Sequence, residues 1–135
     1  MKEIGRTSNV TKEMTDKVFE QDHKGIAVAD NVGTKVMVDA FCIYEKSKAN
    51  GDDVDGYVLK FWDNEGNDWY TSSAVFVKSF MRMAKLQLDM ELNLFPEPMQ
   101  VTIKKVKSSR SGRDYYDIEE APTKEPSQAW KDIDW

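Results

Sequence analysis

Apolar and polar residues alternate along much of this chain, and the spacing of the apolar positions predicts its elements. Strand-like alternation covers residues 35–46, 57–62 and 67–72, and it returns in a hairpin over residues 99–120. Between these segments, apolar residues recur at helical spacing over residues 74–92. A period of two residues is typical of strands with one buried face, whereas spacing of three and four is typical of an amphipathic helix. The pattern therefore predicts five strands, with one helix between the third and the fourth.

The first predicted strand is apolar on both of its faces. One face carries Val36, Val38, Ala40, Cys42 and Tyr44. The opposite face carries Met37, Phe41 and Ile43 beside polar residues. Such a strand either covers apolar surface on both sides or changes face at a β-bulge. Upstream, Thr11 is a candidate N-cap, and Met14, Val18 and Phe19 form a narrow apolar stripe, so we expect a short helix or strand within residues 1–30.

The hairpin over residues 99–120 is basic in an otherwise acidic chain. Its cations are Lys104, Lys105, Lys107, Arg110 and Arg113. No acidic residue interrupts them, and Tyr115 follows closely. Cations next to an aromatic ring match single-stranded nucleic acid, whose phosphates attract positive charge and whose unpaired bases stack on rings. The alternative is a solvated hairpin whose lysines keep an edge strand soluble.

A second group of rings and charge lies on the two preceding strands. In the second strand, Lys60 and Trp62 share the face opposite Leu59 and Phe61, which indicates that this face is not the core. An exposed Trp62 beside a lysine would form a base-stacking platform, unless a helix or the tail covers it. Trp69 and Tyr70 are adjacent on the third strand, so one of them must point outward.

Composition and charge narrow the function classes. The chain has 135 residues and a net charge of −5. Residues 114–135 carry seven acids and two lysines, so this segment accounts for the whole excess and residues 1–113 are neutral. No apolar run is long enough to cross a membrane, and the N-terminus lacks the apolar stretch of a signal peptide, so we expect a cytoplasmic protein. With one histidine, His23, and one cysteine, Cys42, that we expect to be buried, the sequence offers no catalytic or metal constellation, and we expect neither an enzyme nor a cofactor.

The order of elements resembles an OB-fold, an all-β, five-stranded Greek-key barrel that often binds oligonucleotides. The chain looks like an OB-fold single-stranded DNA-binding protein of the divergent bacteriophage type. The resemblance implies a barrel over residues 31–121, an N-terminal extension over 1–30 and a flexible acidic tail over 122–135. Members of this family end in an acidic, aromatic tip that recruits replication and repair enzymes. In this sequence, Asp132, Ile133, Asp134 and Trp135 match that tip.

The resemblance implies sequence-tolerant binding of single-stranded DNA in replication, recombination or repair, in the host cytoplasm if the protein is viral. The expected DNA contacts are Lys60, Trp62, Trp69, Tyr70, Lys104, Lys105, Lys107, Arg110, Arg113 and Tyr115. The resemblance does not decide whether the protein forms a homo-oligomer, because this sequence lacks the Gly-rich N-terminal stretch of the bacterial members. The alternatives are an OB-fold module for protein–protein interaction and an RNA-binding protein.

Overall fold

The computed structural model describes residues 2–20, 23, 25–47 and 54–119, and its chain is mostly β. The strands are β1 (Lys2–Arg6), β2 (Ile26–Ala27), β3 (Lys35–Ser47), β4 (Val54–Asp63), β5 (Asp68–Thr71), β6 (Met99–Lys107) and β7 (Asp114–Ile118). The helices are α1 (Lys12–Val18) and α2 (Ala74–Gln87), with a 3-10 turn at Val28–Asp30. The described part of the structure therefore has seven strands and two helices. The sequence pattern predicted five strands and one helix for the barrel, and a short helix or strand within residues 1–30, the segment that forms β1, α1 and β2.

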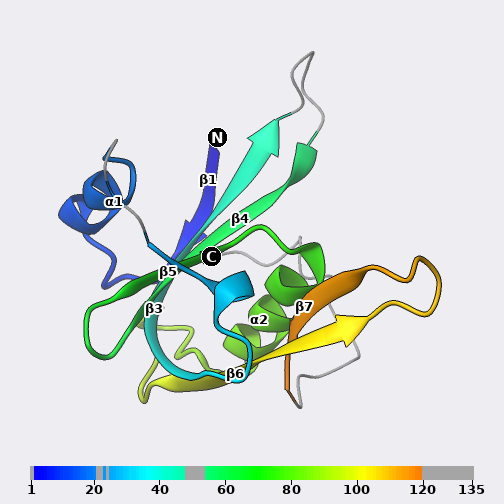
Figure 1. The fold of residues 1–135 in the computed structure, drawn as a ribbon. Coiled ribbons are helices and arrows are strands. Elements are labelled where there is room, and N and C mark those ends of the chain that lie inside the picture. Colours follow the sequence, from blue (N-terminus) through cyan, green and yellow to red (C-terminus); the bar gives the residue numbers. More distant parts are fainter. Residues whose placement is uncertain (1, 21–22, 24, 48–53, 120–135) are drawn as a thin grey trace.

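The strands form one curled, open sheet (Figure 1) in the order β2-β5-β4-β3-β6-β7. β1 pairs with the C-terminal half of β3, on the edge that pairs with β6 at its other end. All of these pairs are antiparallel except β2 with β5. In the described part of the chain, the end strands β2 and β7 do not pair with each other, so the sheet is a half-barrel rather than a closed one.

β3 changes face at a bulge, which is one of the two arrangements that its apolar pattern left open. The register with β4 shifts between Val38 and Ala40. Before the shift, Val36 and Val38 point into the main core, and after it Phe41 and Ile43 do so. The small or apolar residues of the other face then form a second core, which contains Ala40, Cys42 and Tyr44. β3 therefore both changes face at a bulge and covers apolar surface on its two sides.

α2 fills the concave side of the sheet. Its apolar face buries Phe76, Phe80 and Met81, and the Phe80 ring packs edge-on against Phe41 and at a tilt against Phe61. Full burial of such side chains contributes about 1.5–3 kcal/mol each. The helix ends at Gln87, earlier than predicted. Asp89 starts a turn there by accepting hydrogen bonds from the backbone N–H groups of Glu91 and Leu92.

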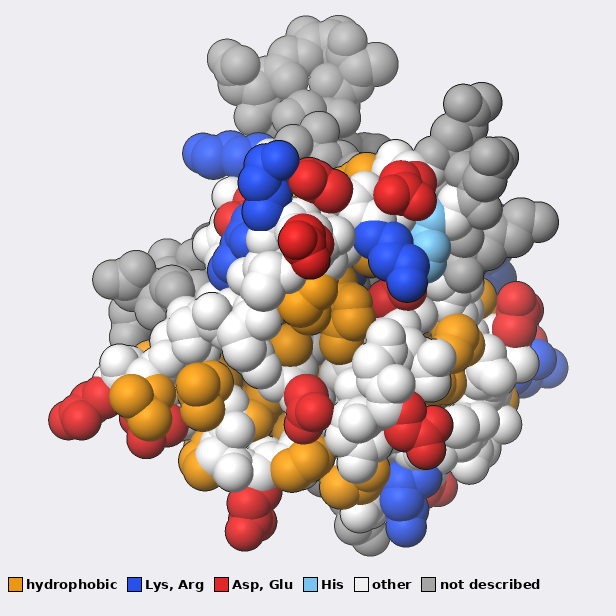
Figure 2. All heavy atoms as spheres, turned by 90° about the vertical axis from the view of Figure 1, so that its left-hand side faces the viewer, with side chains coloured by type: hydrophobic (Ala, Val, Ile, Leu, Met, Phe, Trp, Pro, Cys, Tyr) orange, Lys and Arg blue, Asp and Glu red, His pale blue; other side chains and the backbone are white. Residues whose placement is uncertain are grey.

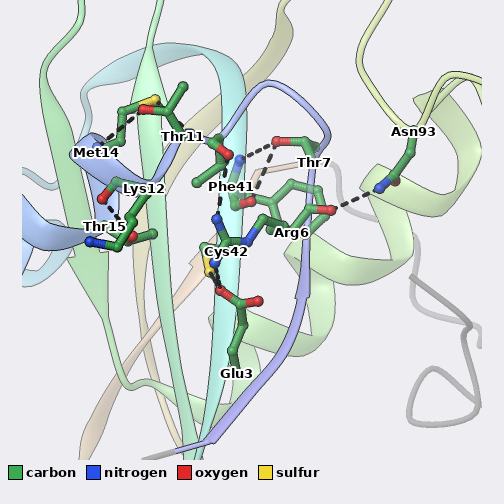
Figure 3. Close-up of polar contacts among 11 residues, drawn as sticks. Glu3, Arg6, Thr7, Thr11, Lys12, Met14, Thr15, Phe41, Cys42 and Asn93 are labelled. Atoms are coloured by element: carbon green, nitrogen blue, oxygen red, sulfur yellow. Dashed lines mark hydrogen bonds and ion pairs between the residues drawn. The ribbon is translucent and has the colours of Figure 1, made fainter.

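Hydrogen bonds tie the N-terminal segment to the half-barrel (Figure 3). The Thr7 hydroxyl accepts a hydrogen bond from the Phe41 N–H at 3.1 Å, and the Thr7 N–H donates to the Phe41 carbonyl at 3.0 Å. The Asn93 side chain donates to the Arg6 carbonyl, and Glu3 pairs with Arg6 and accepts from the Cys42 thiol. The Thr11 hydroxyl accepts from the Met14 N–H and caps α1, as predicted. These bonds fix the chain that leads into α1, and apolar packing of Met14 and Val18 on Ala40 and Trp62 holds α1 against the convex side of the sheet.

Within the described residues, the structure contains no helix that is both long and apolar enough to cross a membrane.

Candidate nucleic-acid interface

Trp62 does not form an exposed platform, so this expectation is wrong. Its side chain is only 7% exposed and packs in the second core with Val10 and Val18, beneath α1. The alternation in β4 is as predicted, since Leu59 and Phe61 are fully buried on the core side. The outer face of β3 and β4 nevertheless carries too much apolar surface to stay open, and α1 covers it.

Of the adjacent pair on β5, Trp69 points inward and Tyr70 outward. Trp69 is 6% exposed, lies parallel to Phe61 with ring centroids 5.9 Å apart, and donates its indole N–H to Asp63 at 3.0 Å. Tyr70 is 40% exposed. Trp69 is thus a core residue and its expected place on the DNA-binding face is wrong, whereas Tyr70 offers a ring to solvent.

Lys60 lies between two aromatic rings on the convex side of the sheet. It is the cross-strand neighbour of Tyr70, and its Nζ lies 5.1 Å from the centroid of the Tyr70 ring. The Phe19 ring, at the end of α1, lies 5.8 Å from the same Nζ and is 49% exposed. Burial lowers the pKa of Lys60, and the negative charge of Asp68 opposes part of this shift. A partly desolvated cation between rings interacts with them by about 1–2 kcal/mol.

Phe19 is a residue that sequence reasoning did not place at this site. It was assigned to the apolar stripe of the N-terminal helix, but it follows the last residue of α1 as its C-cap. There its ring packs edge-on against Tyr44 at 5.3 Å and reaches Lys60. The sequence offered one indication of this role, which is a large aromatic residue just after the end of a short predicted helix.

Two adjoining hollows extend this site across β5, and we call them together the aromatic trough. The first, of about 460 Å³, is lined by residues that include Val18, His23, Gly25 and Lys60. The second, of about 360 Å³, is lined by residues that include Ser72, Ser73, Asp114, Tyr115 and Tyr116. Tyr70 and Ala27 line both hollows, so they connect them. The trough therefore joins Lys60 and Tyr70 to Tyr115, three residues that the sequence had placed at the interface.

His23 and Gly25 line the trough beside β5. The His23 Nε2 lies 2.8 and 2.9 Å from the two carboxylate oxygens of Asp68. Gly25 passes so close that a Cβ atom there would lie 2.6 Å from an Asp68 oxygen and 3.2 Å from the Tyr70 ring. Only glycine permits this approach without displacing its neighbours. Gly25 thus lets the backbone lie directly against Asp68 and the Tyr70 ring.

The basic hairpin is present as predicted, but its cations are not equivalent. Lys105 forms an exposed ion pair with Asp114 at 3.1 Å. Lys104 is half-buried on β6, and Lys107 is exposed at its end. Arg110 and Arg113 lie in the exposed tip, which Gly112 turns with a φ of 68°. Tyr115, half-buried on β7, connects the hairpin to the trough.

The cations and rings do not all share one surface, contrary to expectation. The hairpin tip lies at the opposite end of the molecule from α1 (Figure 1), and so do Arg110 and Arg113 relative to Trp62. Of the predicted site residues in the hairpin, Tyr115 lies in the trough with Lys60 and Tyr70. It pairs with Val106, near the loop end of the hairpin. A ligand that used both ends would run along the trough from Lys60, next to the Phe19 ring, to the hairpin.

The two residues with potentially reactive side chains, Cys42 and His23, are both held in place by the fold. Cys42 is fully buried, as predicted, and burial raises the pKa of its thiol to about 12. His23 is engaged with Asp68. In the described ranges, no three His, Cys, Asp or Glu side chains are grouped so that they could hold a metal ion.

The tip formed by Asp132, Ile133, Asp134 and Trp135 lies outside the described residues. Comparison of this chain with protein-family models, with curated proteins and with solved structures finds no match.

Proposed function

We propose that this protein binds single-stranded DNA without strong sequence preference, along the aromatic trough and the adjoining hairpin. The carrying observation is Lys60 between the Phe19 and Tyr70 rings, in a trough that continues to Tyr115. Bases stack on exposed rings while cations follow the phosphates, and each stacked base is worth about 1–3 kcal/mol. Trp62 and Trp69 have no part in this revised interface, because both are buried.

The curled sheet supports the proposal, because an OB-type barrel binds oligonucleotides on its second and third strands. In this proposal β3 to β7 are the five OB strands, and β4 and β5 carry Lys60 and Tyr70. Membership of a bacteriophage type of single-stranded DNA-binding protein, with a role in replication, recombination or repair, is part of the proposal. So is the recruitment of partner proteins by residues 132–135.

The phosphate contacts in this proposal come from the expected cations that form no ion pair with another residue in the described part of the chain. They are Lys60, Lys104, Lys107, Arg110 and Arg113. If all five neutralise phosphates, the logarithm of the binding constant falls with the logarithm of salt concentration with a slope of about −3.5. Duplex DNA binds more weakly, since its paired bases cannot reach the rings.

Fluorescence anisotropy of labelled oligo-dT, repeated over a salt series, tests the proposal. Tyr70→Ala is expected to lower the affinity about five- to 150-fold. Leu92→Ala is the matched control, because it truncates another exposed apolar residue on the turn after α2 and is expected to change nothing. Equal affinity for duplex and single strand, or no binding at all, would show that the proposal is wrong.

A second candidate function, a protein-interaction module, is favoured by one observation. Leu86, Met90 and Leu92 are 69%, 57% and 60% exposed at the end of α2 and in the following turn. Neighbouring apolar residues with this exposure are typical of interaction surfaces. If Leu92→Ala abolishes capture of a protein partner while Tyr70→Ala leaves oligo-dT binding unchanged, this second function replaces the first.

A further inference from the structure

A separate pocket, which we call the α1 pocket, lies on the convex side of the sheet. It has a volume of about 410 Å³ and lies between α1, β3, β4 and the β4–β5 turn. Met14, Val18, Ala40 and Trp62 supply its apolar lining. Figure 2 shows this side of the molecule, where hydrophobic side chains are accessible between acidic and basic ones. The aromatic trough shares only Val18 with this pocket.

The charged lining of the α1 pocket is mostly negative. Asp39, Asp63 and Asp68 face a single cation, Lys17. Asp68 is engaged with His23, but the side chain of Asp39 makes no hydrogen bond or ion pair within the described part of the chain. A half-buried carboxylate without a partner gains from a cation that reaches it.

Asp63 adds a negative charge that is fixed in position. Its carboxylate accepts hydrogen bonds from the backbone N–H groups of Glu65 and Asn67, from the Asn67 amide and from the Trp69 indole. Burial alone would raise the pKa of Asp63, but these hydrogen bonds outweigh it and lower the pKa below its ordinary value. The carboxylate is therefore ionised at neutral pH, and its hydrogen bonds hold it in place beside the pocket.

Trp62 adds a hydrogen-bond donor to the lining of the pocket. The residue is 7% exposed, and its indole N–H donates to no acceptor among the described residues. The indole nitrogen is not one of the buried, unpartnered polar atoms of the described residues, so solvent reaches it. A ligand in the pocket can therefore offer this N–H an acceptor in place of water.

We propose that the α1 pocket binds a basic segment of a protein partner through an arginine or lysine side chain. The cationic group pairs with Asp39, the methylene stem lies over Trp62 and Val18, and a backbone carbonyl of the segment accepts from the Trp62 indole. The negative lining excludes nucleic acid phosphates from this pocket. The half-barrel would then carry two binding surfaces, the aromatic trough for negatively charged DNA and the α1 pocket for a positively charged side chain.

The test uses the full chain and two short peptides, acetyl-Gly-Arg-Gly-amide and its neutral citrulline counterpart. Binding is followed by the indole signals of ¹⁵N-labelled protein, and the Trp62 signal is identified by its loss in Trp62→Phe. The arginine peptide is expected to shift the Trp62 signal saturably, and the citrulline peptide is not. Asp39→Asn is expected to weaken binding at least about five-fold.

Two further variants keep the test decisive. Lys17→Gln removes the opposing cation and is expected to strengthen binding, and this holds even if Asp39→Asn fails to fold. Glu97→Gln makes the same charge change as Asp39→Asn at an exposed site outside the pocket and is expected to have no effect. Equal shifts with both peptides, no saturable shift, or weaker binding by Lys17→Gln would overturn the proposal. Oligo-dT binding by the same samples tests the DNA-binding proposal separately.

Discussion

Replacement of Trp62 by alanine distinguishes a core residue from a base-stacking platform. The side chain is 7% exposed and packs among Val10, Val18, Ala40, Cys42 and other residues of the second core. Its loss leaves a cavity that joins the α1 pocket and removes most of what α1 packs against. We therefore expect Trp62→Ala to destabilise the fold and to leave the aromatic trough in place.

The expected loss follows from burial. Trp→Ala at buried sites costs about 3–5 kcal/mol, and the lower end applies here because Trp62 borders a pocket. About 3 kcal/mol is a large part of the roughly 5–15 kcal/mol that stabilises a domain. With a urea m-value of about 1.5–2 kcal/mol per M, the unfolding midpoint falls by about 1.5–2 M.

Urea unfolding followed by circular dichroism measures this shift, and anisotropy with oligo-dT in the absence of urea measures binding. Tyr70→Ala serves as the counterpart, since it should weaken binding while moving the midpoint little. If Trp62→Ala keeps its midpoint within about 0.5 M, or if the folded variant loses more than tenfold in DNA affinity, the assignment of Trp62 to the core is refuted.

Three further predictions follow from single contacts. Gly25→Ala should weaken oligo-dT binding several-fold in anisotropy titrations, because a Cβ atom 2.6 Å from Asp68 and 3.2 Å from the Tyr70 ring must displace that ring; unchanged affinity would contradict this. The Cys42 thiol, whose pKa burial raises to about 12, should stay unreactive to Ellman's reagent at pH 8 until the protein is unfolded, and rapid native labelling would show that it is accessible. Asp63 has a pKa lowered in the folded state from an ordinary value of 3.8, so its ionised form stabilises the fold above that pH, and this contribution is lost as the pH falls through the folded value. Asp63→Asn should therefore make the acid-induced fall in stability below about pH 4 shallower in urea titrations, and an unaltered slope would count against the hydrogen-bonded carboxylate.

The strands of the half-barrel were largely predictable because their patterns are local. β3, β4 and β5 lie within a few residues of the predicted segments, and the double apolar face of β3 indicated its bulge. α2 also begins where its spacing predicted, but Asp89 ends it early by accepting two backbone hydrogen bonds. A side chain that competes for backbone donors is hard to recognise inside an apolar periodic run.

The candidate site was less predictable, because exposure depends on what packs from elsewhere in the chain. Period-two alternation correctly placed Trp62 on the face opposite Phe61, but only the position of α1 decides that this face is covered. For Trp69 and Tyr70, strand alternation alone could not decide which ring points inward. In the structure, Asp63 accepts a hydrogen bond from the inward-pointing Trp69. The contribution of Phe19 likewise depends on where a short helix ends against β4.

Photocrosslinking shows directly whether single-stranded DNA occupies the aromatic trough. An oligo-dT with 5-iododeoxyuridine at successive positions is irradiated with the full chain, and the modified residues are identified by mass spectrometry. The aromatic trough predicts adducts on Tyr70 and Tyr115, which Tyr70→Ala reduces at the first position only. Adducts confined to residues outside the trough, or none at a concentration where the oligonucleotide is bound, would contradict the account.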